Sequence, residues 1–506
     1  MRLKNLLAGI LEVTAHDDCE IHGLSQDTRI LKAGDLFFAY PGHLTDGRKY
    51  ISEAVQKGAA AIITIADGSN SFIDHQNLYS IPILFLDNLN ARLGDIAAKF
   101  YDYPAQNMTL IGVTGTNGKT TCAHFIAACV AKAYQRCGVI GSISNGYYDT
   151  FGYHTLHHNS YHLTTPHAFE IHYLLSLFKQ HRIQKVVIEI SSHALDQYRI
   201  SGLVFQIAAF TNLSHDHLDY HPTMDHYAKT KKRLFEMPQL EYAVFNIDDP
   251  YGKKWQGLFA NHTSVYRYTM QALTNTKHRQ NLCSAQLLSN PANAIYAYLK
   301  TPWGQGYLKN SKLVGQFMLS NLLLVMTVLG ILNIPFQESL RYLKNLEPVK
   351  GRMEKLGGTH DKPMIVIDYA HTPDALQTAL QTLKPTTGCL WCIFGCGGNR
   401  DRKKRPLMGS IAEHYADRVI LTQDNPRYEH SQQITEDILA GLKNPTHAMI
   451  QSNRQEAIYF AIKQAQPQDI ILIAGKGHED YQIVGDTELP FNDYAVAKMA
   501  LENLFA

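Results

Sequence analysis

Glycine, lysine and threonine gather in the stretch Gly115-Thr116-Asn117-Gly118-Lys119-Thr120-Thr121, directly after the apolar run 110–113. Backbone N–H groups of such a glycine-rich turn, with the N-terminus of the following helix, cradle phosphate oxygens. The lysine reaches the β- and γ-phosphates and the first threonine hydroxyl ligates Mg²⁺. The usual pattern has a glycine where this chain has Val113. The stretch nevertheless predicts a nucleotide-binding loop, followed by a helix that begins near Cys122.

Acidic and histidine residues follow two later apolar runs. Glu189 lies at the end of the run 186–190, where a carboxylate facing a phosphate loop is a suitable second ligand for Mg²⁺. The segment 211–221 contains three histidines and two aspartates. The same residue types bind zinc, but the sequence offers no further ligands at zinc-site spacing. The residues alone leave the role of this segment open.

Together these motifs resemble the Mur ligase family, the ATP-dependent amide-forming enzymes of peptidoglycan precursor synthesis, and the resemblance runs from about residue 24 to 500. It implies that His217 binds a second Mg²⁺. It also implies that Lys231 is carbamylated by CO₂, which turns a cation into an anion that supports Mg²⁺ and requires the neutral amine. Lys229 and Lys232 are close in sequence, and only the resemblance selects Lys231. The implied catalytic residues are Lys119, Glu189, His217 and Lys231, and the implied metal ligands are Thr120, Glu189, His217 and Lys231.

The resemblance also implies nucleotide contacts outside the loop. Three come from the middle of the chain and three from its last third, so docking of the C-terminal part would complete the ATP site. One of these residues, Asn321, lies in an apolar helical stretch. From the residues alone, its side-chain amide is as consistent with an ordinary hydrogen bond inside the protein as with a contact to a ligand. The implied contacts are Asn246, Asp248, Asn321, Arg352, Asp368 and His371.

The first part of the chain resembles the segments that bind the UDP-linked substrate in this family. Hydroxyl-bearing side chains dominate these positions, together with an arginine suited to an anionic substrate. The implied contacts are Thr28, His43, Leu44, Thr45, Thr164, Thr165, Ser191, Gln197 and Arg199.

Three late segments resemble the members of the family that add meso-2,6-diaminopimelate. This amino acid has a distal carboxylate, which a guanidinium fork binds through two parallel hydrogen bonds. Lysine-adding members lack the arginine of the Asp-Asn-Pro-Arg loop. Arg400 and Arg427 would hold carboxylates, while Glu479 and the Gly475 carbonyl would take an ammonium. The implied contacts are Arg400, Asp424, Asn425, Pro426, Arg427, Gly475 and Glu479.

The resemblance therefore implies a ligase that adds diaminopimelate to the D-glutamate of UDP-N-acetylmuramoyl-L-alanyl-D-glutamate through an acyl phosphate, with ATP and two Mg²⁺ ions. Two alternatives stay open. Folylpolyglutamate synthetase shares the central ATPase but recognises folate. A protein of another class would bind ATP at the loop and change shape without joining anything.

The elements that must position these residues are short apolar runs alternating with helical stretches. Such runs predict an α/β fold with mainly parallel sheets covered on both faces. Functional side chains then lie where the strands end, which is where the unusual polar residues are found. The runs are 110–113, 186–190, 207–210, 242–245, 364–367, 390–394, 419–421 and 470–473.

At 506 residues the chain is long enough for about three domains. A strand-like run before Asp87-Asn88 and the break at Pro335 suggest the boundaries. The expected domains are a UDP-sugar-binding α/β domain (1–88), a central ATP-binding phosphate-loop domain (89–336), and a Rossmann-like ligase domain that binds the incoming amino acid (337–506).

The composition limits the partners. Lys plus Arg number 47 and Asp plus Glu 45, a net charge of +2 that gives no support to a nucleic-acid partner. The most apolar stretch, 317–332, is about one turn too short to span a bilayer. Eight scattered cysteines fit a reducing compartment. We expect a monomeric cytoplasmic enzyme that acts on small molecules and does not insert into a membrane.

Overall fold

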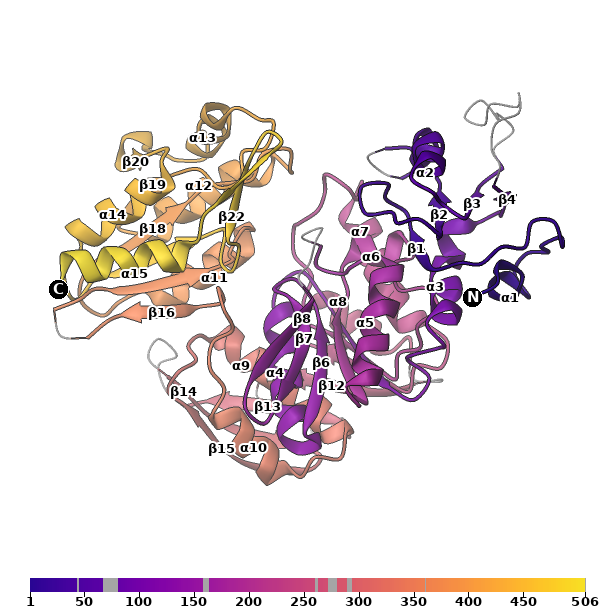
Figure 1. Ribbon diagram of the computed structural model, residues 1–506. Helices are drawn as coiled ribbons and strands as arrows, with labels where there is room; N and C mark the ends of the chain where they lie inside the picture. Colours follow the sequence, from indigo (N-terminus) through magenta and orange to yellow (C-terminus); the bar gives the residue numbers. More distant parts are fainter. Residues whose placement is uncertain are drawn as a thin grey trace.

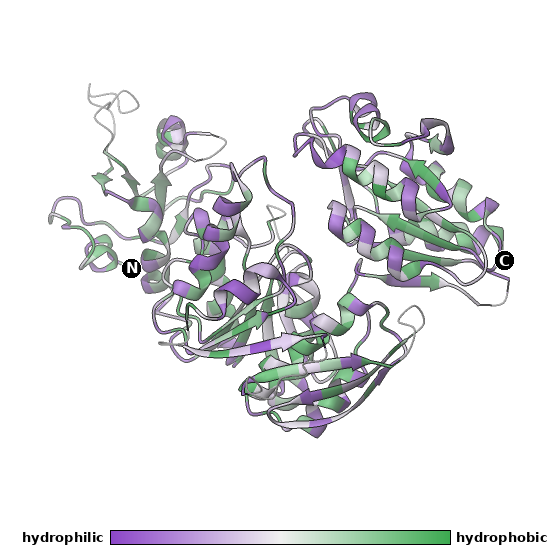
Figure 2. Ribbon diagram, turned by 180° about the vertical axis from the view of Figure 1, so that it is seen from behind, coloured by the Kyte–Doolittle hydropathy of each residue, from purple (hydrophilic) through white to green (hydrophobic). Residues whose placement is uncertain are grey.

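The computed structural model describes residues 1–42, 45–66, 81–157, 163–259, 263–271, 280–288, 294–359 and 361–505. Three lobes follow one another along the chain, each built around its own sheet (Figure 1). Apolar residues concentrate on the strands and inner helix faces, and polar residues on the outward faces (Figure 2). The prediction of an α/β fold with mainly parallel sheets is confirmed.

The N-terminal lobe has a four-stranded parallel sheet in the order β1-β2-β3-β4. Its central strands are fully buried, as expected for a sheet covered on both faces. The elements are α1 (Leu3–Leu7), β1 (Gly23–Ser25), β2 (Asp35–Ala39), η1 (Gly47–Tyr50), α2 (Ile51–Gln56), β3 (Ala61–Thr64), β4 (Ile83–Phe85) and α3 (Leu89–Phe100).

The central lobe has an eleven-stranded sheet in the order β15-β14-β13-β12-β11-β10-β5-β9-β6-β7-β8. The middle strands are parallel, and antiparallel strands extend the sheet at both ends. The strands are β5 (Thr109–Thr114), β6 (Arg136–Ile140), β7 (Asn145–Asp149), β8 (Tyr153–His157), β9 (Lys185–Glu189), β10 (Ile207–Phe210), β11 (Tyr242–Asn246), β12 (Ser264–Thr269), β13 (Leu282–Leu287), β14 (Ile295–Thr301) and β15 (Gly304–Asn310).

Helices cover this sheet. They are α4 (Lys119–Tyr134), α5 (Ala168–Gln180), α6 (Ser192–Asp196), α7 (Met224–Lys232), η3 (Arg233–Glu236), α8 (Pro250–Trp255), α9 (Gln316–Ile331) and α10 (Phe336–Lys344). The helix after the phosphate loop starts at Lys119, three residues earlier than predicted from Cys122. The difference arises because Gly118, at φ 83°, ends the loop and allows the next residue to enter the helix.

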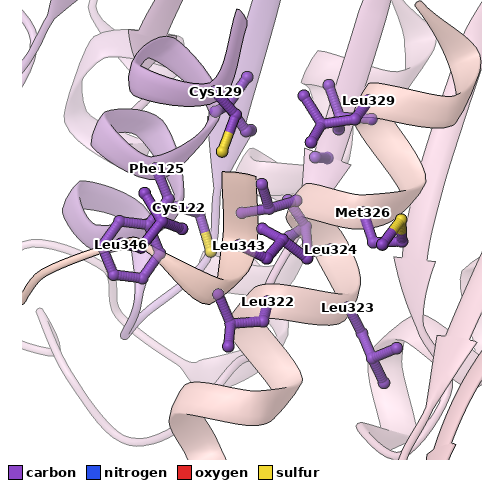
Figure 3. Packing of buried hydrophobic residues seen from close by; sticks show 14 of the residues in the cluster. Cys122, Phe125, Cys129, Leu322, Leu323, Leu324, Met326, Leu329, Leu343 and Leu346 are labelled. Atoms are coloured by element: carbon purple, nitrogen blue, oxygen red, sulfur yellow. The ribbon is translucent and has the colours of Figure 1, made fainter. Parts of the chain in front are cut away.

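The core of the central lobe lies where α4 and α9 pack against each other (Figure 3). Helix α9 is apolar on all sides, and such a helix is stable only when it is surrounded by protein. Cys122 and Phe125 of α4 lie in the same cluster as Leu322 of α9, and Leu343 from α10 closes it. This packing fixes the start of α4, and with it the phosphate loop.

The C-terminal lobe has a six-stranded sheet in the order β16-β17-β21-β18-β19-β20, antiparallel only at β16, and a separate hairpin of β22 and β23. Its elements are β16 (Glu354–Gly357), β17 (Met364–Asp368), α11 (Pro373–Leu383), β18 (Leu390–Phe394), α12 (Lys404–Tyr415), β19 (Arg418–Leu421), α13 (Ser431–Leu439), η5 (Pro445–His447), β20 (Ala448–Ile450), α14 (Arg454–Gln464), β21 (Ile470–Ala474), β22 (Tyr481–Val484), β23 (Thr487–Pro490) and α15 (Asp493–Leu504).

Two helices lie beside the predicted domain boundaries. Helix α3 shares a core with the N-terminal sheet and with Phe169 of α5. Helix α10 and the following residues to Val349 pack into the central core, past the boundary expected at 336. The domain limits of 1–88, 89–336 and 337–506 stay predictions. In the described part of the chain, no helix combines the length and the apolar character that crossing a membrane requires.

Candidate active site

The phosphate loop joins β5 to α4, and the loop after β10 is hydrogen-bonded to it. Asn117 N–H donates to the Asn212 side chain (2.9 Å), and Thr116 N–H donates to the Asn212 carbonyl (2.8 Å). Gly115 has a φ of 145°, and an added Cβ there would lie 1.9 Å from the Thr211 hydroxyl. Only glycine therefore fits this position. Lys119 donates to two carbonyls of its own loop, those of Gly115 and Thr116, at 2.9 and 2.7 Å.

Thr120 and Glu189 lie in direct contact behind this loop. The Thr120 hydroxyl donates to Glu189 Oε2 (2.8 Å), and Ser142 N–H donates to Glu189 Oε1 (3.0 Å). Glu189 is fully buried. Burial raises its pKa, and the bonds from Thr120 and Ser142 act in the opposite direction. A hydroxyl and a carboxylate side by side are the hard oxygen donors that Mg²⁺ prefers.

Burial distinguishes Lys231 from the two nearby lysines, Lys229 and Lys232. Its side chain on α7 is buried, and Nζ donates to the Gly115 carbonyl at 2.8 Å. Lys229 and Lys232 instead form ion pairs with Asp225 and Glu236 at 2.9 and 2.8 Å. Burial, reinforced by the charge of Lys119, holds the pKa of Lys231 well below its usual range. The neutral amine required for carbamylation is therefore favoured at this position.

His217 lies in the turn after β10 with a φ of 54°, and its Nε2 is 3.3 Å from Asp216 Oδ2. Burial holds the pKa of His217 well below its usual range against the opposing charge of Asp216, and the neutral imidazole is the form that binds metals. Asp216 also faces His371 (3.7 Å) and Lys404 (3.9 Å) from the C-terminal lobe. Burial alone would raise the pKa of Asp216, but His217, His371 and Lys404 outweigh it and hold that pKa well below its usual range.

The C-terminal lobe reaches the phosphate loop through polar contacts. Arg352 donates to the Thr120 hydroxyl at 3.1 Å, and its guanidinium lies 4.2 Å from the centre of the Tyr369 ring. Asn117 donates to Asp374 at 3.1 Å. Two predicted nucleotide contacts, Arg352 and His371, thus reach the loop region from another lobe.

Asp368, at the end of β17, receives the Met353 N–H at 2.8 Å beside this cluster, and burial raises its pKa. The remaining predicted nucleotide residues line the other side of the loop. Asn321 lies on α9 so close to the loop that a Cβ on Gly118 would be 2.7 Å from its Oδ1. Asn246 donates to the Thr211 carbonyl at 2.8 Å and accepts the Asp248 N–H at 3.0 Å, so its amide holds the fold locally.

The predicted UDP-substrate residues of the central lobe form one hydrogen-bonded network. Arg199 donates to the Thr165 carbonyl (2.9 Å) and to the Gln197 side chain (2.6 Å). The Thr165 hydroxyl donates to the Glu189 carbonyl (2.7 Å) and accepts the Ser191 N–H (3.0 Å). Burial lowers the pKa of Arg199 to about 10. The network therefore runs from the backbone of Glu189 to Arg199, a partly desolvated cation suited to an anionic substrate.

Thr164 joins the same network, because its hydroxyl accepts from Ser142 at 3.2 Å. Thr28 lies buried in the N-terminal lobe, where its carbonyl accepts from Lys57 at 2.8 Å. Thr45 is exposed, and His43 and Leu44 lie outside the described residues.

The predicted diaminopimelate residues come together in the C-terminal lobe. Arg427, at a φ of 53°, donates to the Gly398 carbonyl at 3.0 Å. Its own N–H donates to Ile483 of β22, and its carbonyl accepts from Gly485, so the hairpin fixes its backbone on both sides. Burial lowers the pKa of Arg427, and the nearby charge of Arg400 acts in the same direction. Such a pair of cations favours an anionic ligand.

Asp424, Pro426 and Gly475 complete this set. A Cβ on Gly475 would lie 2.5 Å from Asp424 Oδ2, and one on Gly398 would lie 1.9 Å from the Pro426 carbonyl. The loops at 395–400, 424–427 and 475–479 therefore pack closely enough to act on one ligand.

The side chains around the phosphate loop differ in how well they suit the implied Mg²⁺ ions. In the described part of the chain, no group of three His, Cys, Asp or Glu side chains could hold a metal by itself. Mg²⁺ in phosphate-transfer sites is usually held by one or two protein groups, with water and phosphate completing its shell. Thr120 and Glu189 fit that requirement. Lys231 fits only after carbamylation, since its amine now donates to a carbonyl.

Three residues of the site were missed by the sequence analysis. Asp216 joins two lobes, Ser142 holds Glu189, and Lys476 lies fully buried among the diaminopimelate residues. No local pattern marks Ser142. For Asp216 and Lys476, the available signal was a charged residue directly beside a predicted site residue, His217 or Gly475.

Three family models match the chain. They are the Mur ligase family, catalytic domain (residues 20–101), the Mur ligase middle domain (113–329), and the Mur ligase, glutamate ligase domain (351–477).

Curated relatives match along nearly the whole chain. A UDP-N-acetylmuramoyl-L-alanyl-D-glutamate–2,6-diaminopimelate ligase from Coxiella burnetii is 43% identical over 485 residues, covering 96% of each chain. The protein of the same name from Pseudomonas putida is 40% identical over 491 residues, again covering 96% of each.

Solved structures agree with these matches. One of a UDP-N-acetylmuramoyl-L-alanyl-D-glutamate–2,6-diaminopimelate ligase has a TM-score of 0.63 and 32% identity, covering 96% of this chain and 95% of that one. MurF from Acinetobacter baumannii has a TM-score of 0.65 over 99% of this chain and 98% of its own, but its 16% identity supports the fold alone. With its phosphate loop, its three sheets and these matches along its length, the chain belongs to the Mur ligase family.

Proposed function

We propose that this protein is a ligase of the MurE type, which uses ATP to add meso-2,6-diaminopimelate to the D-glutamate of UDP-N-acetylmuramoyl-L-alanyl-D-glutamate. The observation that carries the proposal is the arrangement of Arg427. Its backbone is fixed by the β22–β23 hairpin, and its guanidinium lies beside the loop that bears Arg400. The partly buried Arg427, with the exposed Arg400 near it, suits the distal carboxylate that lysine lacks.

The reaction divides into two steps. A carboxylate oxygen of the D-glutamate attacks the γ-phosphorus of ATP, ADP leaves, and an acyl phosphate forms. The amine of diaminopimelate then attacks the acyl carbon, phosphate leaves, and the nitrogen loses a proton to give the amide. Lys119 at the loop would neutralise charge that develops on the phosphate, and Arg352 would add a second cation from the C-terminal lobe.

Mg²⁺ would supply charge neutralisation at the phosphates, where Thr120 and Glu189 would hold one ion and His217 and carbamylated Lys231 a second. The contacts around Glu189 keep its carboxylate in one orientation, because Thr120 and Ser142 each bind one of its oxygens. The C-terminal lobe would also exclude water from the acyl phosphate, since its residues lie directly against the phosphate loop.

The test is phosphate release and UDP-tripeptide formation with ATP, Mg²⁺ and UDP-N-acetylmuramoyl-L-alanyl-D-glutamate. Reactions contain meso-diaminopimelate, L-lysine or no amino acid. We expect turnover with diaminopimelate alone. Preference for lysine would retain the ligase and reject the role given to Arg427, and no turnover with either amino acid would reject the proposal.

Arg427→Ala gives the matching test of specificity. We expect the KM for diaminopimelate to rise about 30-fold or more, because the variant loses a charge-assisted hydrogen-bonded pair with the substrate. The KM for ATP should stay within about twofold of the wild-type value. Equal rises in both constants would contradict the carboxylate-binding role.

Two alternatives are less well supported. A folylpolyglutamate synthase from Mycobacterium tuberculosis has a TM-score of 0.58 over 77% of this chain, but its 16% identity carries the fold alone. A non-catalytic ATP-binding protein would not need Lys119, Thr120, Glu189 and Lys231 to converge on one loop. We expect the enzyme to act in the cytoplasm as a monomer.

A further inference from the structure

Lys476 is a charged side chain that the proposed reaction leaves without a role. It follows β21 and lies between Gly475 and Glu479, two residues predicted to bind diaminopimelate. Its side chain has no exposed surface. Burying an ammonium is costly unless hydrogen bonds and a counter-charge compensate for the lost water. Its contacts therefore indicate what it does.

The Lys476 ammonium joins two side chains of the proposed amino-acid site. Nζ donates to Glu479 Oε2 at 2.9 Å and to Asn425 Oδ1 at 3.1 Å. Asn425 Nδ2 also donates to Glu479 Oε2, at 2.8 Å. Lys476, Asn425 and Glu479 thus form a closed triangle across the loops 424–427 and 475–479. The ring of Tyr481, 5.5 Å from Nζ, lies within the range of a cation–π contact.

The hydrogen bonds of the triangle use one carboxylate oxygen of Glu479 and leave the second oxygen for another partner. Both donors bind Oε2, and in the described part of the chain no protein group donates to Oε1. The side-chain oxygen Oδ1 of Asn425 is fully used, since it also accepts the Ile483 N–H at 3.0 Å and an amide oxygen has two lone pairs. Glu479 is therefore held in one orientation, with Oε1 available to an incoming ammonium.

We propose that Lys476 is a positioning residue for the distal ammonium of diaminopimelate, acting through Glu479 and Asn425 rather than touching the ligand. This inference rests on the proposed function. It separates two parts of recognition. Arg400 and Arg427 read the distal carboxylate, while Lys476 sets the geometry by which Glu479 reads the neighbouring ammonium.

The test compares diaminopimelate with L-2-aminopimelate, which keeps the reacting amine and the distal carboxylate but lacks the distal ammonium. The wild type is expected to prefer diaminopimelate. Lys476→Met should reduce the ratio of the two kcat/KM values by about tenfold or more, because Glu479 loses its fixed orientation. Lys476→Arg, which keeps a buried donor and charge, should retain part of the preference, and the KM for ATP should not change.

A merely structural role would lower kcat/KM for both amino acids equally and leave their ratio intact, and that result would overturn the inference. Because Lys476→Met leaves a carboxylate unpaired, it could fail to fold, so a second comparison is needed. Glu479→Gln alone leaves the Lys476 ammonium bound to the neutral Asn425 Oδ1, whereas Glu479→Gln with Lys476→Met removes both charges and leaves neither unpaired. They should show the same reduced ratio, and a further drop in the double variant would also refute action through Glu479.

The failure of this inference is distinguishable from failure of the proposed function. If the wild type does not ligate diaminopimelate at all, the function is wrong. If it does, and the ratio survives in the folded Lys476 variant, only the role of Lys476 is wrong.

Discussion

Arg405 is a buried cation whose removal should destabilise the C-terminal lobe far more than removal of its exposed neighbour. Its side chain has no exposed surface and donates to both oxygens of Glu429 at 2.6 and 2.7 Å, to Asp437 at 2.8 Å, and to the Gly397 carbonyl at 3.2 Å. Arg402 binds the same Asp437 at 2.9 Å, but its side chain is 59% exposed. The two arginines share Asp437 but differ in burial and in their further partners, since only Arg405 also binds Glu429 and the Gly397 carbonyl.

The expected magnitudes follow from this difference. Breaking a buried ion pair by removing one partner costs about 3–5 kcal/mol. Because the Glu429 and Asp437 side chains are 18% and 17% exposed, water compensates in part, and we expect about 3 kcal/mol for Arg405→Met. An exposed pair contributes about 0–1 kcal/mol, so Arg402→Met should have little effect. For a lobe of this size, about 3 kcal/mol corresponds to a fall in Tm of roughly 6–12 °C.

The assay is thermal unfolding of both variants and the wild type, with hydrogen exchange of residues 397–400 to identify the lobe that responds. Arg405→Met should also raise the KM for diaminopimelate, because the Gly397 carbonyl and Glu429 hold the loop that carries Arg400. Equal shifts in Tm for the two arginine variants would refute the reasoning from burial.

Three further results are expected. Lys231→Ala should abolish ligation, whereas Lys229→Ala, which removes an exposed pair, should leave kcat within about twofold; similar losses would show that burial does not select the functional lysine. Gly115→Ala should prevent ATP binding in calorimetry, because its Cβ would overlap a threonine hydroxyl, while Gly257→Ala, with open space around it, should bind normally. Arg405 lowers the pKa of Glu429 to about 2, so the stability lost in Glu429→Gln should be full above about pH 4.5 and shrink as pH falls toward 2; a loss independent of pH would contradict this.

The strands of the parallel sheets were predictable because their signal is local. The runs 207–210 and 390–394 are continuous apolar segments bounded by polar residues, and the strands β10 and β18 have the same limits. The antiparallel strands were missed, and so were the parallel strands β2, β3 and β6. In β14 buried and partly exposed residues alternate, and tyrosine and lysine interrupt the apolar pattern. Such a strand lacks the continuous run used to recognise the others.

The candidate site was predictable where a motif fixes the backbone and less so where long-range packing decides. The phosphate loop follows from its glycines. The difference between Lys231 and its neighbours depends on where α7 lies against the Gly115 carbonyl, which no local spacing encodes. Lys476 shows the same limit, since its burial arises from loops fifty residues apart in sequence.

The two outer lobes are joined to the central one by different kinds of contact. Helix α3 and Phe169 share an apolar core with the N-terminal sheet, whereas the contacts of the C-terminal lobe at the phosphate loop are hydrogen bonds and ion pairs, including His215 with Asp401 at 2.8 Å. Water can replace polar partners but not buried apolar ones. Near the start of α9 an apolar contact is also present, where Val314 and Phe317 pack with the core of the C-terminal lobe. We therefore expect separation of the C-terminal lobe from the phosphate loop to cost little free energy, because water can replace its polar partners there. The residues predicted to hold the UDP-linked substrate would keep their places through every turnover, while the nucleotide site, which two lobes complete, opens and re-forms.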